Sequence, residues 1–505
     1  MSAHEPSTFA AAWQRAVFDG PSRPFLTFEG PSGEIADWTY GEFDGLVNRA
    51  MATLRSEGVV QGSAVHLALT NSPTFIAVWL AAVRLGAWIV PSDPMSRAPE
   101  LADHISRTEP VVGFCAESRA EPYVEAAGSM RVIRVDESDT ELRWLGGTID
   151  VVPGDPTPRD RAAVMFTSGT TGRPKGVEIT QANYAFAGQA MAGASGLTSE
   201  DRQIVVLPLF HANAQYYSFA SAIAVGASVA LMHTFSASGF LPQVARHGAT
   251  CASLFAAPMR MILARGEKVE GVALRHCWYA QNITPEQHKT LTDWFGCPPR
   301  QLYGMTETIP AVLTDTGNDP LSDSMGFVTD GCTVALHGPD GAAVSDGDIG
   351  EIVVNGVPGE TLFAGYLDDE RTTVASFRDG WFLTGDRARR DPDGRWYFDG
   401  RRSDVLKVSG ENVSTVEVEA VITAHPAVLE ASVIGAPDDV RDEVPVAFVV
   451  ASDPTAPPTV QDLTNWCAER LSKPKVPTQF TFLNELPRTS VGKIRKFLLK
   501  EKTSL

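Results

Sequence analysis

Residues 167–176, TSGTTGRPKG, combine the side chains and the backbone freedom that a bound phosphate requires. Glycine lets backbone N–H groups turn toward an anion, and Gly169 and Gly172 supply that freedom here. Four hydroxyls add further hydrogen-bond donors, at Thr167, Ser168, Thr170 and Thr171. The segment is not a P-loop of the type G-x-x-x-x-G-K-[ST], because two residues separate the second glycine from Lys175. We therefore predict a phosphate-binding loop of another kind.

A buried strand is expected to deliver this loop to the edge of a sheet. The apolar run AAVMF leads directly into it, and α/β sheets bind ligands at the carboxyl ends of their strands. Upstream, Ser72 and Pro73 predict the start of a helix, Gly86 its end, and AWIVP a following strand. Further strands are predicted in RAAVMFTS, QIVVLPLF, GASVALMHTF and ATCASLFAA.

This alternation predicts an α/β fold, with a large N-terminal domain of stacked β-sheets covered by helices. The segment DPDGRWYFDGRRSD places turn residues and charges between two apolar segments, as a hinge or linker would. We therefore predict an N-terminal domain over residues 1–401 and a small, mobile α+β domain over residues 402–505.

Composition excludes several classes of protein. The formal net charge of -19 over 505 residues argues against nucleic acid or an anionic membrane as the main partner. The six cysteines form no C-x-x-C pair, so neither a zinc site nor a disulfide framework is expected. The N-terminus lacks a basic start followed by an apolar run, and FIAVWLAAV is too short to span a bilayer. We predict a cytoplasmic monomer or homodimer.

Four more motifs follow the first in a fixed order: YGMTET, WFLTGD, GRRSDVLKVSGENVSTVEVE and PRTSVGKIRK. Together the five resemble the signature of the adenylate-forming superfamily, which contains acyl-CoA synthetases, luciferases and the adenylation domains of peptide synthetases. The segments YGMTETI, GVPGETLF, GENVSTVEVEAVITAHPAV, RDEVPVAFVV and SKPKVP most resemble crotonobetaine/carnitine-CoA ligase-like proteins. The resemblance spans nearly the whole chain.

The resemblance implies a nucleotide site for ATP and Mg²⁺. Thr306 would meet the α-phosphate, Glu307 would help to bind Mg²⁺, and Asp386 would accept hydrogen bonds from the ribose hydroxyls. Arg401 would lie near the ribose and the phosphates, and Lys175 would help to close the loop over the β- and γ-phosphates. The remaining residues expected to contact the nucleotide or cofactor are Thr167, Ser168, Gly169, Thr170, Thr171, Gly172, Tyr303 and Gly410.

The resemblance assigns catalysis to Lys493. Attack of a carboxylate on the α-phosphate brings two anions together, so catalysis must chiefly neutralise charge, and Mg²⁺ and an ammonium group are suited to this. The second domain is then expected to rotate and present the acyl adenylate to an acceptor. If the acceptor is coenzyme A, its phosphates need binding groups, for which the candidates are Lys473, Lys475, Arg441 and the backbone at Ser409-Gly410.

A pocket for the acid is expected along LPLFHANAQYY and WYAQNITPE. The resemblance implies that His211 orients the acyl group. The other pocket residues would be Phe210, Asn213, Gln215, Tyr216, Tyr279, Ala280, Gln281 and Met305. Many relatives carry small residues where this chain has Tyr279, Ala280 and Gln281, which favours a small or polar acid over a long fatty acid. Trp278, Tyr279 and Tyr216 would either bind a quaternary ammonium group or simply pack in the core.

Rotation is expected at Arg402 and Ser403. The family commonly has Asp or Lys where this chain has Ser403, so the balance between the two domain positions stays open. Three functions remain at this point. The first is a ligase that forms a small acyl-CoA thioester. The second is an adenylating enzyme that uses an amine or a carrier protein as acceptor, or that activates nitrite for diazotisation of an aryl amine. The third, a non-catalytic protein with this fold, would have lost the motif residues that this chain retains.

Overall fold

The computed structural model describes residues 7–146, 152–167, 174–401, 405–408, 411–438, 441–488 and 494–500. The chain divides into two compact units. The first comprises Met1–Ser322, Gly326–Thr333 and Val354–Trp381, and the second comprises Asp323–Met325, Val334–Val353 and Phe382–Leu505. This division by contacts differs from the predicted boundary at 401/402, which concerns a hinge of motion and stays a prediction.

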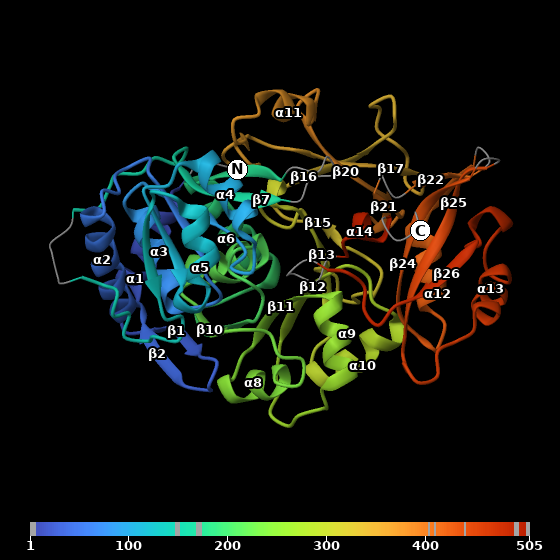
Figure 1. Ribbon diagram of the computed structural model, residues 1–505, viewed down its shortest axis with the longest axis horizontal. Coiled ribbons are helices and arrows are strands. Elements are labelled where there is room, and N and C mark those ends of the chain that lie inside the picture. The colour runs from blue at the N-terminus through green and yellow to red at the C-terminus, as the bar shows by residue number, and fades with distance from the viewer. Residues whose placement is uncertain are drawn as a thin grey trace. The chain divides into compact units, whose positions relative to one another are not determined.

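The first unit contains a nine-stranded sheet in the order β15-β14-β13-β12-β11-β9-β10-β1-β2 (Figure 1). Its strands are β1 (Pro24–Glu29), β2 (Ile35–Thr39), β9 (Arg202–Val205), β10 (Ser228–Met232), β11 (Cys251–Phe255), β12 (His276–Ala280), β13 (Arg300–Tyr303), β14 (Leu313–Thr314) and β15 (Phe327–Val328). The strands from β1 to β13 along this order pair in parallel, whereas β2, β14 and β15 pair antiparallel. The carboxyl ends of the parallel strands therefore share one edge.

A seven-stranded sheet completes the first unit in the order β18-β8-β7-β4-β3-β5-β6. Its strands are β3 (Ala64–Ala68), β4 (Trp88–Pro91), β5 (Val112–Ala116), β6 (Arg131–Val135), β7 (Arg161–Thr167), β8 (Lys175–Thr180) and β18 (Gly365–Tyr366). The strands from β7 to β6 along this order are parallel, and β8 pairs antiparallel with both β7 and β18. The predicted phosphate loop thus joins two antiparallel neighbours.

Helices cover both sheets of this unit. They are α1 (Phe9–Asp19), α2 (Tyr40–Ser56), α3 (Pro73–Arg84), α4 (Ala98–Thr108), α5 (Ala120–Ala127), α6 (Gln181–Ser195), the π-helix η2 (Asn213–Ala220), α7 (Ser221–Val225), α8 (Phe240–His247), α9 (Ala256–Arg265), α10 (Pro285–Phe295) and α11 (Glu370–Ala375). Figure 1 shows α8, α9 and α10 together, and their apolar side chains form one core with β9 to β12. On the opposite face, η2 packs on β9 and β11.

The second unit is built from two smaller sheets. One contains β16 (Thr333–His337), β17 (Ile349–Asn355), β20 (Trp381–Arg390) and β21 (Trp396–Arg401). The other contains β22 (Val405–Val408), β23 (Glu411–Ser414), β24 (Val428–Asp438), β25 (Asp442–Ala451) and β26 (Gln479–Phe482). Helices α12 (Thr415–Thr423) and α13 (Val460–Ala468) pack on one face of the second sheet, and α14 (Lys496–Lys500) packs on the other. The predicted α+β character is confirmed.

The local signals read from the sequence correspond to these elements. Ser72 caps α3 by accepting a hydrogen bond from the backbone N–H of Phe75 at 3.3 Å, and Gly86 follows with φ +71°. The strands predicted in RAAVMFTS, GASVALMHTF and ATCASLFAA are confirmed as β7, β10 and β11. The strand predicted in QIVVLPLF is shorter than expected, because β9 ends at Val205 and LPLF continues as a turn. The turn residues near DPDG form a hairpin between β20 and β21, so WYFDGR is a strand and not a linker.

The sequence predicted neither a disulfide framework nor a membrane-spanning segment. Among the described residues, all six cysteines are free thiols, and burial raises the pKa of Cys251 to about 11. Within the same described ranges, no helix combines the length and the apolar character that a bilayer crossing requires.

Candidate active site

The ends of the phosphate loop are fixed by a strand pair. Thr167 closes β7 and Lys175 opens β8, and the two residues are partners in the antiparallel register. The hydroxyl of Thr167 donates to the backbone carbonyl of Lys175 at 3.5 Å. The five loop residues predicted between them lie outside the described residues: Ser168, Gly169, Thr170, Thr171 and Gly172. The hairpin therefore fixes both points where the loop leaves the sheet.

Helix α4 also contacts both ends of this loop. The guanidinium of Arg107 donates to the carbonyl of Pro174 at 2.7 Å and lies 4.8 Å from the centre of the Phe166 ring. His104 stacks on the same ring, with centroids 3.9 Å apart and planes inclined by 4°. Sequence reasoning missed Arg107, because nothing local to α4 signals its distant partner.

Glu307 lies in a 3₁₀ turn, η3 (Thr306–Thr308), which begins three residues after the end of β13, and is 4% exposed. Its carboxylate accepts a hydrogen bond from the Tyr366 hydroxyl at 3.0 Å, and its backbone carbonyl accepts from Phe363 N at 3.0 Å. The Lys175 ammonium lies 4.6 Å from the centre of the Tyr366 ring. Tyr366 thus contacts two predicted site residues, although the sequence analysis did not single it out.

Close packing explains the glycine of YGMTET. A Cβ on Gly304 would lie 2.9 Å from both the Tyr217 hydroxyl and the backbone of Ala311, closer than carbon atoms tolerate. The loop is further fixed by Thr308, whose hydroxyl donates to the carbonyl of Met305 at 3.0 Å. Ile309 then adopts a φ of +71°, which is unfavourable for a β-branched residue. The turn that carries Thr306 and Glu307 is therefore rigidly specified.

The segment around η2 holds buried polar atoms that have no hydrogen-bond partner among the described residues. These atoms are His211 Nε2, both amide atoms of Asn213, and the Tyr216 hydroxyl. Ser253 Oγ, on β11 against which η2 packs, is a fourth such group. Burial lowers the pKa of His211 to about 4, so its imidazole is neutral at pH 7. Buried polar groups in native proteins are usually paired, and water or a bound ligand would supply the missing partners.

Two predicted pocket residues are placed differently from the expectation. The side chain of Tyr279 packs in the core beneath α8, α9 and α10, and its hydroxyl donates to the carbonyl of Ser322 at 3.0 Å. The prediction that Tyr279 narrows a pocket, or binds a cation there, is therefore wrong, because strand alternation turns it to the other face. Gln215 is fully buried, with its amide nitrogen donating to the Leu209 carbonyl and its amide oxygen accepting from the Tyr184 hydroxyl.

The other predicted pocket residues follow neighbouring strands. Ala280 ends β12, and the exposed Gln281 follows it with a φ of +73°. Tyr303 ends β13, the strand beside β12, and Met305 follows. Phe210 is 8% exposed and its ring lies 4.4 Å from that of His211. Because β12 and β13 are parallel, the residues at and beyond their carboxyl ends lie at the same edge of the sheet.

In the second unit, the predicted ribose residues form a pair. Asp386 on β20 lies opposite Arg401 on β21, and the guanidinium Nε donates to the carboxylate at 3.0 Å. The Asp386 side chain is only 5% exposed, whereas that of Arg401 is 36% exposed. Gly385, with φ +74°, donates its N–H to the Glu351 carboxylate at 3.0 Å. Carboxylate and guanidinium are thus held together by the hairpin.

The remaining predictions of this unit are only partly described. Arg402, Ser403, Ser409, Gly410 and Lys493 lie outside the described residues. Among the candidates for coenzyme A, Lys475 forms an ion pair with Glu417 at 2.7 Å and Arg441 pairs with Asp438 at 2.9 Å. Lys473 is exposed. Two of the three cations therefore already have acidic partners.

A divalent cation fits the donor set in one particular way. Among the described residues, no three acidic, histidine or cysteine side chains gather as a metal cluster. Mg²⁺ at nucleotide sites usually takes one or two protein carboxylates and completes its shell with phosphate oxygens and water. The buried carboxylate of Glu307 is suited to that mode.

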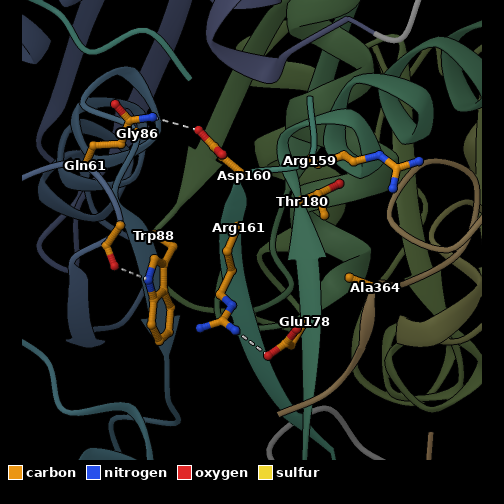
Figure 2. Close-up of a pocket in the computed structure, with 10 residues that line it drawn as sticks. Gln61, Gly86, Trp88, Arg159, Asp160, Arg161, Glu178, Thr180 and Ala364 are labelled. Atoms are coloured by element: carbon orange, nitrogen blue, oxygen red, sulfur yellow. Dashed lines mark hydrogen bonds and ion pairs between the residues drawn. The ribbon is translucent and has the colours of Figure 1, made fainter. Parts of the chain in front are cut away.

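A pocket of about 400 Å³ lies elsewhere in the first unit, at the Arg161 end of β7 (Figure 2). The Arg161 guanidinium lies 4.7 Å from the centre of the Trp88 ring and forms an ion pair with Glu178 (Figure 2). None of the predicted site residues is among the described residues that line it. It therefore adds nothing to the candidate site.

Known proteins resemble this chain along most of its length. A 32% identical crotonobetaine/carnitine-CoA ligase of Salmonella arizonae aligns over 94% of this chain and 95% of its own length. An anthranilate CoA ligase, AuaEII, crystallised with anthranoyl-AMP, is 25% identical with a TM-score of 0.89 and covers 99% of this chain and 98% of its own. An o-succinylbenzoate CoA synthetase from Bacillus subtilis, with its acyl-adenylate intermediate, is 28% identical with a TM-score of 0.84, covering 97% of each chain.

Family models match in two blocks. The model of the AMP-binding enzymes matches residues 13–367, and the model of the AMP-binding enzyme C-terminal domain matches residues 417–493. The first block contains the phosphate loop, η2 and the Glu307 turn, and the second contains Lys493. The chain belongs to the AMP-binding enzyme family.

Proposed function

We propose that this protein uses ATP to convert a small, polar carboxylic acid into an acyl adenylate, with release of pyrophosphate, and then transfers the acyl group to coenzyme A. The family membership and the CoA ligases among its relatives support an AMP-forming ligase. The nature of the acid must be argued from the residues of this chain.

The observation that carries the proposal is the group of unpaired polar atoms around η2. Leaving a buried donor or acceptor unsatisfied costs about 1–3 kcal/mol per group. An aliphatic acyl chain would leave His211, Asn213, Tyr216 and Ser253 unpaired when it displaced water from them. A substrate with its own donors or acceptors would pair with them, so the site favours a polar acid.

The charge of the site limits this acid further. Burial keeps His211 neutral, so its imidazole supplies no cation, and burial raises the pKa of Tyr216 far above its usual range, so its phenol supplies no anion. An anionic substituent on the acyl group would therefore lack a counter-ion among the residues of the η2 segment. A neutral hydroxyl or amide, or a quaternary ammonium held against Tyr216 or Trp278, fits better.

The nucleotide roles follow from the motif residues. Thr306 would donate to the α-phosphate, and Glu307 would hold Mg²⁺, which would neutralise phosphate charge when bound. Lys175 would contact the β- and γ-phosphates, and Tyr303 would lie beside the adenine base. Asp386 would accept hydrogen bonds from the ribose hydroxyls.

The remaining charged groups would act in the attack on the α-phosphate and in the binding of coenzyme A. The Lys493 ammonium would stabilise the charge that develops as the acid oxygen attacks the α-phosphate, because it can bridge both groups of oxygen atoms. In the second step the thiolate of coenzyme A would attack the acyl carbonyl and AMP would leave. Lys473, Lys475 and Arg441 are the cations proposed for the phosphates of coenzyme A.

The test is acid-dependent formation of AMP and pyrophosphate over matched carboxylates. The panel pairs butyrate with 4-hydroxybutyrate and with γ-butyrobetaine, and adds benzoate, anthranilate, a long fatty acid and nitrite, each with and without coenzyme A or an aryl amine. We expect a polar member to exceed its aliphatic partner at least tenfold in kcat/KM and to require coenzyme A for release. Preference for the fatty acid, or turnover with nitrite or only with the amine, would contradict the proposal.

A further inference from the structure

Tyr366 contacts both Lys175, at the start of β8, and Glu307, in the turn after β13. It occupies the two-residue strand β18, paired antiparallel with β8, and its register partner is Val177, two residues beyond Lys175. Its backbone N–H donates to the Thr373 hydroxyl at 2.8 Å, and the next residue, Leu367, donates to the Gly176 carbonyl at 2.8 Å. These bonds fix the backbone of Tyr366 relative to β8.

The side chain is equally constrained. It is 7% exposed, and its ring packs edge to face against Phe363, with centroids 4.9 Å apart. Phe363 in turn donates its N–H to the Glu307 carbonyl at 3.0 Å. The ring therefore has a defined orientation, with its face toward the Lys175 ammonium at 4.6 Å and its hydroxyl on the Glu307 carboxylate at 3.0 Å.

One neutral side chain thus contacts a cation and an anion through different parts of itself. The aromatic face attracts the Lys175 ammonium and leaves its N–H donors free for phosphate oxygens. In an ion pair with a carboxylate, those N–H donors would already be used. The phenol hydroxyl donates to Glu307 and fixes the direction of that carboxylate.

A competing partner for Lys175 is close at hand. The pKa of Asp369 is lowered, chiefly by hydrogen bonds from Thr372, and the charge of Lys175 contributes to the same shift. An ammonium released from the ring would therefore be drawn toward Asp369 or toward Glu307 itself. An ion pair with Asp369 or with Glu307 would draw Lys175 away from the phosphates. The pair with Glu307 would also occupy the carboxylate that is proposed to bind the metal ion.

We propose that Tyr366 is a positioning residue that holds Lys175 and Glu307 ready for the nucleotide, the first through its ring and the second through its hydroxyl. This inference rests on the proposed function, because it takes these two residues to bind the phosphates and the divalent cation of ATP. The two contacts are separable, since phenylalanine retains the ring and lacks the hydroxyl.

The experiment compares Tyr366→Phe and Tyr366→Leu with the wild type. Pyrophosphate binding to the metal-free protein, measured by calorimetry, reports on Lys175. Mn²⁺ binding to the protein saturated with ATP, measured by electron paramagnetic resonance, reports on Glu307. The matched control is Tyr40→Phe, which removes a buried hydroxyl that donates to the Ala227 carbonyl at 2.7 Å.

We expect Tyr366→Phe to weaken Mn²⁺ binding about tenfold while it leaves pyrophosphate affinity within about twofold, because only the hydroxyl is lost. Tyr366→Leu should weaken Mn²⁺ binding similarly and also weaken pyrophosphate binding about fivefold, because the cation–π contact is lost as well. Tyr40→Phe should change neither affinity.

Wild-type Mn²⁺ affinity in Tyr366→Phe, or a phenylalanine variant that loses pyrophosphate affinity as strongly as the leucine variant, would overturn the division of roles. Equal losses in Tyr40→Phe would reduce the effect to general destabilisation and overturn it too. A wild-type protein that binds no ATP would refute the proposed function as well, which separates that failure from failure of Tyr366 alone. If Tyr366→Leu does not fold, the phenylalanine comparison still decides the role of the hydroxyl.

Discussion

Buried polar groups are hydrogen-bonded at the amino end of strand β9 and unpaired beyond its carboxyl end. Just before its amino end, Asp201 accepts hydrogen bonds from Arg275 Nε and Nη2, both at 2.6 Å, from the Thr250 hydroxyl at 2.8 Å and from Thr198 N at 2.8 Å. Beyond its carboxyl end, the segment leading into η2 leaves polar atoms of Asn213 and its neighbours unpaired.

This difference separates stability from binding within one sheet. A fully paired carboxylate such as Asp201 stabilises the fold, because every oxygen lone pair that leaves water finds a donor. Unpaired atoms at the opposite end contribute no such stabilisation and are available to a ligand. At β9, the carboxyl end is thus the end whose polar groups are available to a ligand, and this agrees with the edge at which α/β sheets bind ligands.

The largest effect is expected from breaking the paired end. Asp201→Asn loses the charge-assisted bonds to Arg275, whose side chain is 39% exposed, and this should lower the free energy of unfolding by about 3 kcal/mol. Urea denaturation followed by circular dichroism measures it. Activity per folded molecule should stay unchanged; a selective loss of activity with normal stability would contradict the division into two ends.

The same substitution predicts a pH dependence. Burial raises the pKa of Asp201, but hydrogen bonds from Arg275, Thr198 and Thr250 outweigh it and hold the pKa well below its usual range. The unfolded chain then binds a proton more readily, so the extra stability is complete above about pH 5 and declines as the pH falls below about 4. The stability gap between the wild type and Asp201→Asn should narrow over that window.

A second effect arises from His211 at the unpaired end. Its pKa is about 4 when folded, because burial disfavours the charged form, and about 6.5 when unfolded. The unfolded state therefore gains a proton first as the pH falls, and the wild type should lose about 2–3 kcal/mol between pH 6.5 and 4 from this residue. In His211→Leu that component is absent, so the free energy of unfolding should depend less steeply on pH. Parallel curves for the two proteins would contradict a neutral, buried His211.

A smaller effect should appear in catalysis when Asn213 is replaced. Asn213→Leu removes two unpaired polar atoms with little change in volume, so the free energy of unfolding should stay equal or rise slightly. The kcat/KM for a polar acid should fall about tenfold or more, because its hydrogen-bonding group loses a partner. Thermal denaturation and steady-state kinetics with butyrate and 4-hydroxybutyrate measure both, and equal losses for the two acids would refute a specific contact.

The smallest change is expected from Tyr216→Phe, which deletes one unpaired hydroxyl. Its effect on stability should lie within about 0.5 kcal/mol, because no hydrogen bond is broken in the absence of substrate. Thr250→Val is the matched variant at the paired end, where a similar loss of one hydroxyl should cost about 1 kcal/mol. If both variants are equally destabilised, the two ends do not differ as inferred.

Sequence reasoning succeeded where the signal was local. The cap at Ser72 and the apolar run of β7 specify their own elements. The pairing of Asp386 with Arg401 was not predicted, because the segment between them was interpreted as a linker and not as a hairpin. Sequence reasoning failed where the outcome depends on which face of a strand is covered: alternation places Tyr279 opposite to its neighbours, but only the packing of α8 to α10 decides which face is the core. It missed Tyr366, because a two-residue strand has no periodicity and its partners are distant in the sequence.

The π-helical form of η2 bears on how substrate range could diverge. A π-helix places about one more residue in each turn than an α-helix, so η2 can be regarded as an α-helix that carries an insertion. Removing one residue would allow the α form, and the change would be absorbed within η2 itself, so that α7 (Ser221–Val225) keeps its place. Tyr216 would then face a different neighbour without being mutated. A single codon deletion in this helix is therefore a short evolutionary route to a new acyl specificity that leaves the nucleotide motifs intact.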